Sequence, residues 1–337
     1  MKTLLRQFVI GTGIVLLTTG TTVAQPFTMK MSSPTVNDVT QEWMNKFKAG
    51  VESRAGGRIK FEIYPANQLG QIPATVQGVV FKTIELTAPA TGFLISLDQR
   101  FQIFDAPGLF DDMAHATRVL TDPEIRKRLA TFGEKSGVEP LVVYPHGPLM
   151  LLSHRPVRTV ADFKGQKFRV AGPAPLHIEP FKKLGAIPLS MPLGDVLPAM
   201  QNKAIDGSIA SASVFTAFKY YDVTKALTFL PSSYLIVGAL VNREFMKSLG
   251  PELESIVREE ALKAQLSVAT WAIEDAERTM QTWKKNGGEI ISFSRADTDM
   301  YLRDVTSIMP TITAGNQLLK DDYEALLAAA RKYRKQQ

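Results

Sequence analysis

Hydrophobic positions along the chain switch between a period of two, which is typical of strands, and a spacing of three or four, which is typical of helices. Residues 27–32 and 59–64 fit a strand, and between them Trp43, Phe47 and Val51 fall on one face of a predicted helix. Gly and Pro residues separate these segments. Because strands alternate with helices, the sequence predicts an α/β protein whose sheets are covered by helices.

The same order continues further along the chain. Either Asn37 or Thr40 is expected to cap the first helix. Further strands are expected at residues 141–144, 167–170, 187–191, 234–241 and 290–293, and further helices around 76–81, at 175–184, from 195 onward, and at 318–333.

One predicted helix is unusually long. The segment from Pro251 to Lys285 has no internal Pro or Gly and carries apolar residues at roughly helical spacing. At 1.5 Å per residue it would extend for about 50 Å, which is long for a single compact domain. Such a helix can lie across two lobes that enclose a cleft. The alternative is a helix broken by a kink.

The N-terminus has the order of a secretory signal peptide. Lys2 and Arg6 precede an apolar run at residues 8–17, and small residues end at Ala24. We expect cleavage near Ala24, with an uncleaved anchor as the alternative. The apolar run is shorter than the ~20 residues of a spanning helix, so the protein is not expected to be membrane-embedded. The absence of Cys excludes disulfides and lipid attachment through an N-terminal Cys, which favours a freely diffusing periplasmic protein.

Charge and motifs argue against two large classes of function. The formal net charge is +6 with acids and bases interspersed, so no concentrated basic face for nucleic acid is expected. The sequence has no Cys nucleophile, no Gly-x-Ser-x-Gly elbow, no P-loop and no His-Glu-x-x-His motif. We therefore expect no enzyme activity and no cofactor, and a secreted enzyme of unrecognised type is the alternative.

The histidines do not predict a metal site. They are His115, His146, His154 and His177, and none are spaced like a metal-binding pair. His146 and His154 flank one predicted strand, but no third ligand is evident. Surface or hydrogen-bonding roles are therefore favoured, and no metal is expected.

Several segments, taken in order, resemble a known family. They are Asp162–Val170, Lys183–Ala186, Leu197–Gln201 and Ala204–Gly207, supported by Gly56–Ile59, Tyr64–Pro65, Gln68–Gly70 and Phe104–Phe110. In this order they resemble the DctP-type solute receptors of tripartite ATP-independent periplasmic (TRAP) transporters. The resemblance covers nearly the whole mature chain. It implies a two-lobed periplasmic-binding-protein fold with strand exchange between the lobes and a long helix spanning both.

Domain boundaries follow from this resemblance and from the predicted elements. We expect residues 1–24 to be the signal peptide. Lobe I is expected to comprise residues 25–146 and 236–275, and lobe II residues 147–235 and 276–337. The long helix, at about 251–286, is expected to cross both lobes.

The resemblance also implies a ligand-binding residue. In this family the Arg of the Lys-x-Arg-Val strand clamps the ligand's carboxylate, and that position is Arg169 here. A guanidinium matches a carboxylate bidentately, which gives strong and directional hydrogen bonds. The alternative for Arg169 is a residue of a surface ion pair.

The other expected contacts carry no charge. Where some relatives add a second Arg, this chain has Leu149 and Met150, and where relatives offer an Asn it has Ala210, near Ser208, Ser211 and Ser213. The first-lobe loop contributes Ala90, Thr91 and Phe93, and the candidates for the cleft wall are Phe93, Leu149, Leu193, Phe215 and Tyr234. Each wall candidate has a core role as its alternative, and the serines can instead satisfy backbone groups.

The combined prediction is a periplasmic receptor that captures a small organic acid rather than converting it. One cation among hydroxyls and apolar walls favours a monocarboxylate, with apolar and aromatic acids as candidates. By the resemblance, its partners are the membrane permease subunits of a TRAP transporter. A receptor for sensing is the alternative. Some relatives co-bind a cation, but no acidic cluster here predicts one.

Overall fold

The computed structural model describes residues 26–334. Its strands within that range form one sheet. The strand order is β2 (Ile59–Tyr64), β1 (Phe27–Ser32), β3 (Leu86–Thr87), β8 (Ala226–Asn242), β4 (Val138–Ser153), β7 (Gly207–Ser211), β5 (Lys167–Val170) and β6 (Ile187–Ser190), and β9 (Glu289–Ile291) pairs with β8. The predicted signal peptide lies outside the described residues.

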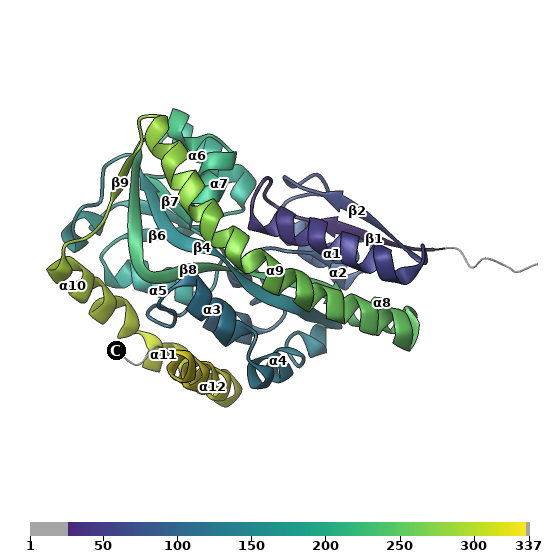
Figure 1. Cartoon of the computed structure of the whole chain (residues 1–337). Coiled ribbons are helices and arrows are strands. Elements are labelled where there is room, and N and C mark those ends of the chain that lie inside the picture. The colour runs from purple at the N-terminus through teal and green to yellow at the C-terminus, as the bar shows by residue number, and fades with distance from the viewer. Residues whose placement is uncertain (1–25, 335–337) are drawn as a thin grey trace, which may run out of the picture.

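Helices surround this sheet (Figure 1). They are α1 (Val39–Ala55), α2 (Ile72–Val80), α3 (Met113–Leu120), α4 (Pro123–Leu129), α5 (Pro175–Lys183), α6 (Val196–Gln201), α7 (Ala212–Ala217), α8 (Arg243–Ser248), α9 (Gly250–Lys285), α10 (Arg295–Thr306), α11 (Met309–Thr313) and α12 (Gln317–Tyr333). Two short 3₁₀ helices, η1 (Thr91–Phe93) and η2 (Gln99–Asp105), carry residues of the site described below.

Two long antiparallel strands, β4 and β8, form the centre of the sheet. Their pairing runs from Val138 opposite Asn242 to Ser153 opposite Ala226. The C-terminal end of β8 pairs with β3 through Leu240 and Val241, whereas the C-terminal end of β4, residues 149–153, pairs with β7. Each long strand therefore passes from one part of the molecule to the other. This is the strand exchange that the resemblance implies.

The prediction of β4 as residues 141–144 is too short, because the strand contains prolines. Pro140, Pro145 and Pro148 each lie at a shift in the register between β4 and β8. A bulge accommodates a residue that cannot donate a ladder hydrogen bond, and it also increases the local twist. The prolines mark irregularities within one strand rather than its ends.

The N-terminal cap of α1 is Asp38, not Asn37 or Thr40. Its carboxylate accepts a hydrogen bond from the Gln41 amide at 3.1 Å, while Thr40 lies inside the helix. The apolar face of α1 is buried as predicted. On that face Trp43 donates from Nε1 to the Ala261 carbonyl of α9 at 3.2 Å.

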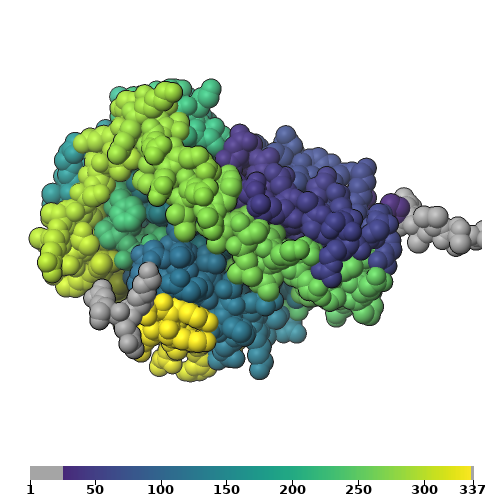
Figure 2. All heavy atoms as spheres, in the orientation of Figure 1, coloured from purple at the N-terminus to yellow at the C-terminus, as the bar shows by residue number. Residues whose placement is uncertain are grey.

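The long helix is continuous over its 36 residues, so the kinked alternative is wrong. It crosses the molecule from the region of α6 and α7 to α8 (Figure 1). Gln265 donates to the Val143 carbonyl of β4 at 2.8 Å, and Trp283 donates to the Lys225 carbonyl at 3.0 Å. Figure 2 shows the outer side of α9, in green, as a band beside the purple N-terminal segment.

The predicted fold class, an α/β fold with strand exchange and a long crossing helix, is confirmed. The boundaries of lobes I and II stay a prediction. Among the helices of residues 26–334, none combines the length and the apolar character needed to cross a membrane.

Candidate functional site

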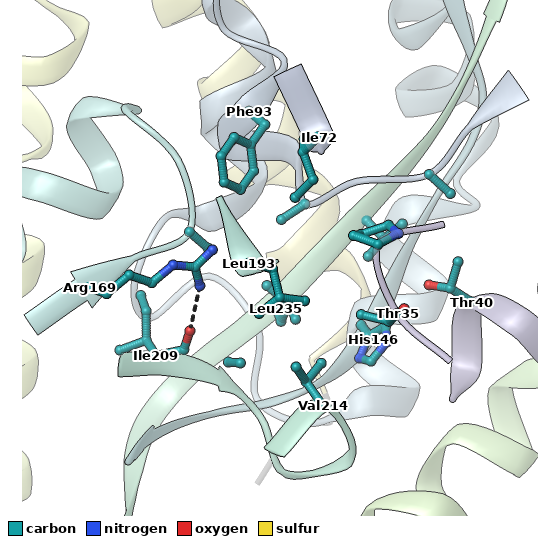
Figure 3. A pocket seen from close by; sticks show the side chains of 16 residues that line it. Thr35, Thr40, Ile72, Phe93, His146, Arg169, Leu193, Ile209, Val214 and Leu235 are labelled. Carbon is teal, nitrogen blue, oxygen red and sulfur yellow. Dashed lines mark hydrogen bonds between the residues drawn. The ribbon is translucent and has the colours of Figure 1, made fainter. Parts of the chain in front are cut away.

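A cavity with an empty volume of about 420 Å³ lies beyond the carboxyl ends of β1, β3 and β5. Crevices at such strand ends are the usual ligand sites of α/β sheets. The lining residues are Pro34, Thr35, Thr40, Ile72, Ala88, Ala90, Phe93, His146, Arg169, Ala171, Leu193, Ile209, Ala210, Val214, Leu235 and Val237 (Figure 3). Most of these side chains are apolar.

Arg169 of β5 is held in place by backbone groups. Its Nε donates to the Met191 carbonyl at 3.0 Å, and its Nη1 donates to the Ile209 carbonyl at 3.1 Å. The guanidinium carbon lies 6.0 Å from the centre of the Phe93 ring. Both carbonyls belong to segments that follow or pair with β5, so the fold orients the guanidinium into the cavity (Figure 3).

Arg169 is a buried cation without an acidic partner among residues 26–334. Only 2% of its surface is exposed, and its two hydrogen bonds go to neutral carbonyls. Burial lowers the pKa of the guanidinium to about 10, and Tyr220 opposes this shift. The group still carries its charge at neutral pH. A buried charge is costly unless an opposite charge pairs with it, so the arrangement favours an anion in the cavity.

A hydrogen-bonded chain lies at the opposite side of the cavity from Arg169. His146 Nε2 is 2.9 Å from Asp38 Oδ2, and His146 Nδ1 is 2.9 Å from Ser211 Oγ. Ser211 Oγ is in turn 2.9 Å from Ser213 Oγ. The chain connects the start of α1 with β4, β7 and α7, and thus joins segments from both predicted lobes.

The contacts of Asp38 favour its ionised form. Burial by itself raises the pKa of Asp38, but its interaction with His146, together with hydrogen bonds from Thr35 and the Gln41 amide, outweighs this effect. The pKa therefore lies below its usual value. In the same region the Thr40 hydroxyl accepts from the Tyr144 hydroxyl at 3.2 Å.

Five of the predicted ligand contacts come together around the main cavity: Ala90, Phe93, Arg169, Leu193 and Ala210. A second cavity, which shares His146 with the first, is lined by Met150, Ser211 and Ser213 among others. Leu149 pairs with Ser211 across the sheet and lines neither cavity. Contact of any of these residues with a ligand stays a prediction.

Three other predicted contacts lie in the core instead of the main cavity. Thr91 donates to Asp105 Oδ2 at 2.9 Å. Phe215 is fully buried, with its ring centre 5.3 Å from that of Tyr220. Tyr234 donates to the Asp111 carbonyl at 2.9 Å. For Phe215 and Tyr234 this packing agrees with their core alternative, and contact of these three side chains with a ligand stays a prediction.

Sequence reasoning missed most of the polar end of the cavity. Pro34 and Thr35 follow β1 directly, so their place after a strand was a usable signal. Thr40 gave no such signal because it reads as part of a helix start. His146 is buried and hydrogen-bonded, as one of its two expected roles states, but its place beside the cavity depends on the bulges of β4. Among the described residues, no three His, Cys, Asp or Glu side chains could together hold a metal ion.

Comparison with known proteins gives relatives over most of the chain. The chain is 28% identical over 271 residues to the 2,3-diketo-L-gulonate-binding periplasmic protein YiaO of Escherichia coli, covering 77% of this chain and 82% of YiaO. It is 26% identical over 289 residues to the C4-dicarboxylate-binding periplasmic protein DctP of Rhodobacter capsulatus, covering 85% and 86%.

Solved structures agree with the fold. A TRAP periplasmic solute-binding protein from Desulfovibrio salexigens with bound orotic acid superposes with a TM-score of 0.83 at 25% identity, covering 90% of this chain and 99% of that one. The sugar acid binding protein DctPAm from Advenella mimigardefordensis superposes with a TM-score of 0.85 at 22% identity, covering 92% and 99%, and supports the fold alone.

The family itself is identified by a match that extends from residue 31 to residue 313. This range includes Arg169, the cavity and all of α9. The resemblance to the DctP-type receptors is thereby confirmed, and the chain belongs to the DctP family, the bacterial extracellular solute-binding proteins of family 7.

Proposed function

We propose that this protein is the periplasmic receptor of a TRAP transporter and that it captures a small monocarboxylate. One observation carries the proposal. Arg169 is buried at a cavity, has no acidic partner among the described residues, and has only neutral carbonyls as hydrogen-bond acceptors. A ligand carboxylate would supply the missing negative charge and accept two parallel hydrogen bonds from the guanidinium N–H groups.

The walls of the cavity support an acid with an apolar body. Ile72, Phe93, Leu193, Val214 and Leu235 surround the space in front of Arg169 (Figure 3). No second Lys or Arg is among the lining residues within 26–334. Small-molecule sites are typically apolar with a few placed polar groups, which fits a ligand with one carboxylate.

The relatives support an organic acid as the solute. YiaO is named for 2,3-diketo-L-gulonate, DctP for C4-dicarboxylates, and the Desulfovibrio structure holds orotic acid. These solutes differ in size and charge, so the monocarboxylate preference rests on the cavity of this chain. In our proposal the lobes close over the acid by a hinge motion, and the closed form delivers it to the membrane permease subunits.

A thermal unfolding screen against mono- and dicarboxylates tests this function. A ligand present at a hundred times its dissociation constant stabilises the folded state by ~2.7 kcal/mol. We expect at least one monocarboxylate to raise the melting temperature in a concentration-dependent way, and neutral amides of the same acids to have no effect. A response to amides equal to that of the acids would contradict the proposal. Product formed over many turnovers would instead establish the enzyme alternative.

A further inference from the structure

The two ends of the cavity differ in charge. Arg169 supplies a cation at one end, and Thr35, Thr40 and His146 lie across the cavity from it (Figure 3). Behind His146 lies the carboxylate of Asp38, 2.9 Å from its Nε2. Asp38 is only 1% exposed, so the imidazole ring separates this acid from the cavity. What a solute meets at this end depends on whether His146 neutralises the acid.

Hydrogen-bond accounting favours a neutral His146. In that state Nε2 donates to Asp38, Nδ1 accepts from Ser211, and Ser211 accepts from Ser213, so every proton has an acceptor. If the ring were charged, Nδ1 would donate to Ser211 and Ser211 would donate to Ser213. The Ser213 proton would then have no acceptor among the described residues, although Ser213 is only 4% exposed. An unsatisfied buried donor is unfavourable, so the neutral form of His146 is favoured and supplies no positive charge against that of Asp38.

The other charged groups near His146 do not cancel the negative charge at this end of the cavity. Asp275 of α9 is also buried and interacts with both His146 and Asp38; burial raises the pKa of Asp275. Arg278 bonds to Asp275 at 3.3 Å and is half exposed. The amides at the start of α1 offset part of the charge of Asp38, because a helix N-terminus carries a partial positive charge. The far end of the cavity is therefore mildly negative.

We propose that Asp38, acting through His146, is a specificity-determining residue that excludes solutes with a second carboxylate. This inference rests on the proposed function, because it assumes that one carboxylate binds Arg169. A second carboxylate at the far end would meet a like charge in a poorly hydrated site, with an expected loss of about tenfold in affinity. The receptor would thus take acids whose far end is neutral or positively charged.

Asp38→Asn tests the inference with little change in shape. Asn is as good a helix cap as Asp, and its amide oxygen can take the place of Oδ1 and accept from the Gln41 amide. Its amide nitrogen then takes the place of Oδ2 and donates to Nε2 of the other neutral tautomer of His146. The probes are four pairs measured by titration calorimetry: butyrate and succinate, pentanoate and glutarate, hexanoate and adipate, and benzoate and terephthalate. The wild type should bind the monocarboxylate of at least one pair about tenfold more tightly than its partner. Asp38→Asn should reduce this ratio to within about twofold by tightening the dicarboxylate.

The matched control is Asp112→Asn, at the N-terminal cap of α3. Asp112 accepts from the His115 amide and does not line the cavity, so this variant should keep the wild-type ratio. Asp38→Ser, which also caps helices, replaces the asparagine variant if the latter does not fold. An unchanged ratio in the Asp38 variants would overturn the inference and leave the proposed function standing. Equal binding of both members of every pair by the wild type would overturn the inference and the monocarboxylate preference, but not the capture of an organic acid. Binding of no carboxylate by the wild type would contradict both.

Discussion

Replacing Arg169 with Met should abolish carboxylate binding while the free protein stays folded. The guanidinium is the lone Lys or Arg side chain among the cavity residues of the described chain. Removing one partner of a buried charged hydrogen-bonded pair costs about 2–5 kcal/mol, so affinity should fall by about 30-fold or more. Titration calorimetry with the best acid from the screen measures this loss.

The stability of the Arg169→Met variant separates a binding role from a structural one. Arg169 has no ion pair within residues 26–334, so we expect the free energy of unfolding without ligand to change by no more than about 1 kcal/mol. Arg169→Lys keeps the charge but loses the fork of donors, and should retain weak binding. Unchanged affinity in Arg169→Met would show that the carboxylate binds elsewhere.

Arg100 is the matched control, because it is equally a buried Arg but has acidic partners. Its guanidinium bonds to Asp98 at 2.6 Å and to Asp322 at 3.2 Å. Arg100→Met would leave Asp98 without its cationic partner and Asp322 with Arg128 alone, and should lower the free energy of unfolding by about 3 kcal/mol or more. Its ligand affinity should match the wild type at temperatures where it is folded. We therefore expect Arg169→Met to lower ligand affinity and leave stability nearly unchanged, and Arg100→Met to lower stability and leave ligand affinity unchanged.

Gly92→Ala should weaken binding by about a hundredfold through a different route, by preventing closure of the predicted lobes. Gly92 lies in η1 of the first predicted lobe, and Gly172 follows β5 in the second. A Cβ on Gly92 would collide with the His177 ring and would lie 2.8 Å from the Ala171 carbonyl oxygen. A Cβ on Gly172 would lie 2.6 Å from the Gly92 backbone. The two backbones thus touch without side chains between them.

This contact lies beside Arg169, the proposed carboxylate-binding residue. Phe93, next to Gly92, faces Arg169, which lies three residues before Gly172. Backbone atoms such as the Ala171 carbonyl cannot move aside as a flexible side chain does. An added methyl group must therefore hold the two segments apart, and the ligand would lose part of its contacts with one lobe.

Small-angle scattering together with calorimetry tests the closure prediction. The wild type should become more compact with the acid, whereas Gly92→Ala should keep the radius of gyration of its free form. Gly165→Ala is the control for affinity. Its φ of 74° strains an Ala residue and should lower the free energy of unfolding, but a Cβ there has no neighbour within 4 Å, so ligand affinity at temperatures where the variant is folded should equal that of the wild type. Compaction of Gly92→Ala equal to the wild type would contradict a role for this contact in closure.

Local pattern was sufficient for most elements of the fold. The strands predicted at 27–32, 59–64 and 167–170 have the bounds of β1, β2 and β5, because each is a short run with strand character that ends near Gly or Pro. The long helix was evident because 35 residues pass without an internal breaker. The full lengths of β4 and β8 were not evident from the sequence, because prolines that normally end a strand are tolerated at bulges.

The sequence by itself determined the succession of strands and helices, the family resemblance and the candidate clamp Arg169, because these depend on neighbouring residues or on ordered motifs. Which side chains meet became evident from the three-dimensional structure. Asp38, His146 and Ser211 come from distant segments, and the register of β4 against β7 and β8 brings them together behind the cavity. Spacing along a chain contains no information on such pairings, because long-range register depends on the packing of the whole sheet.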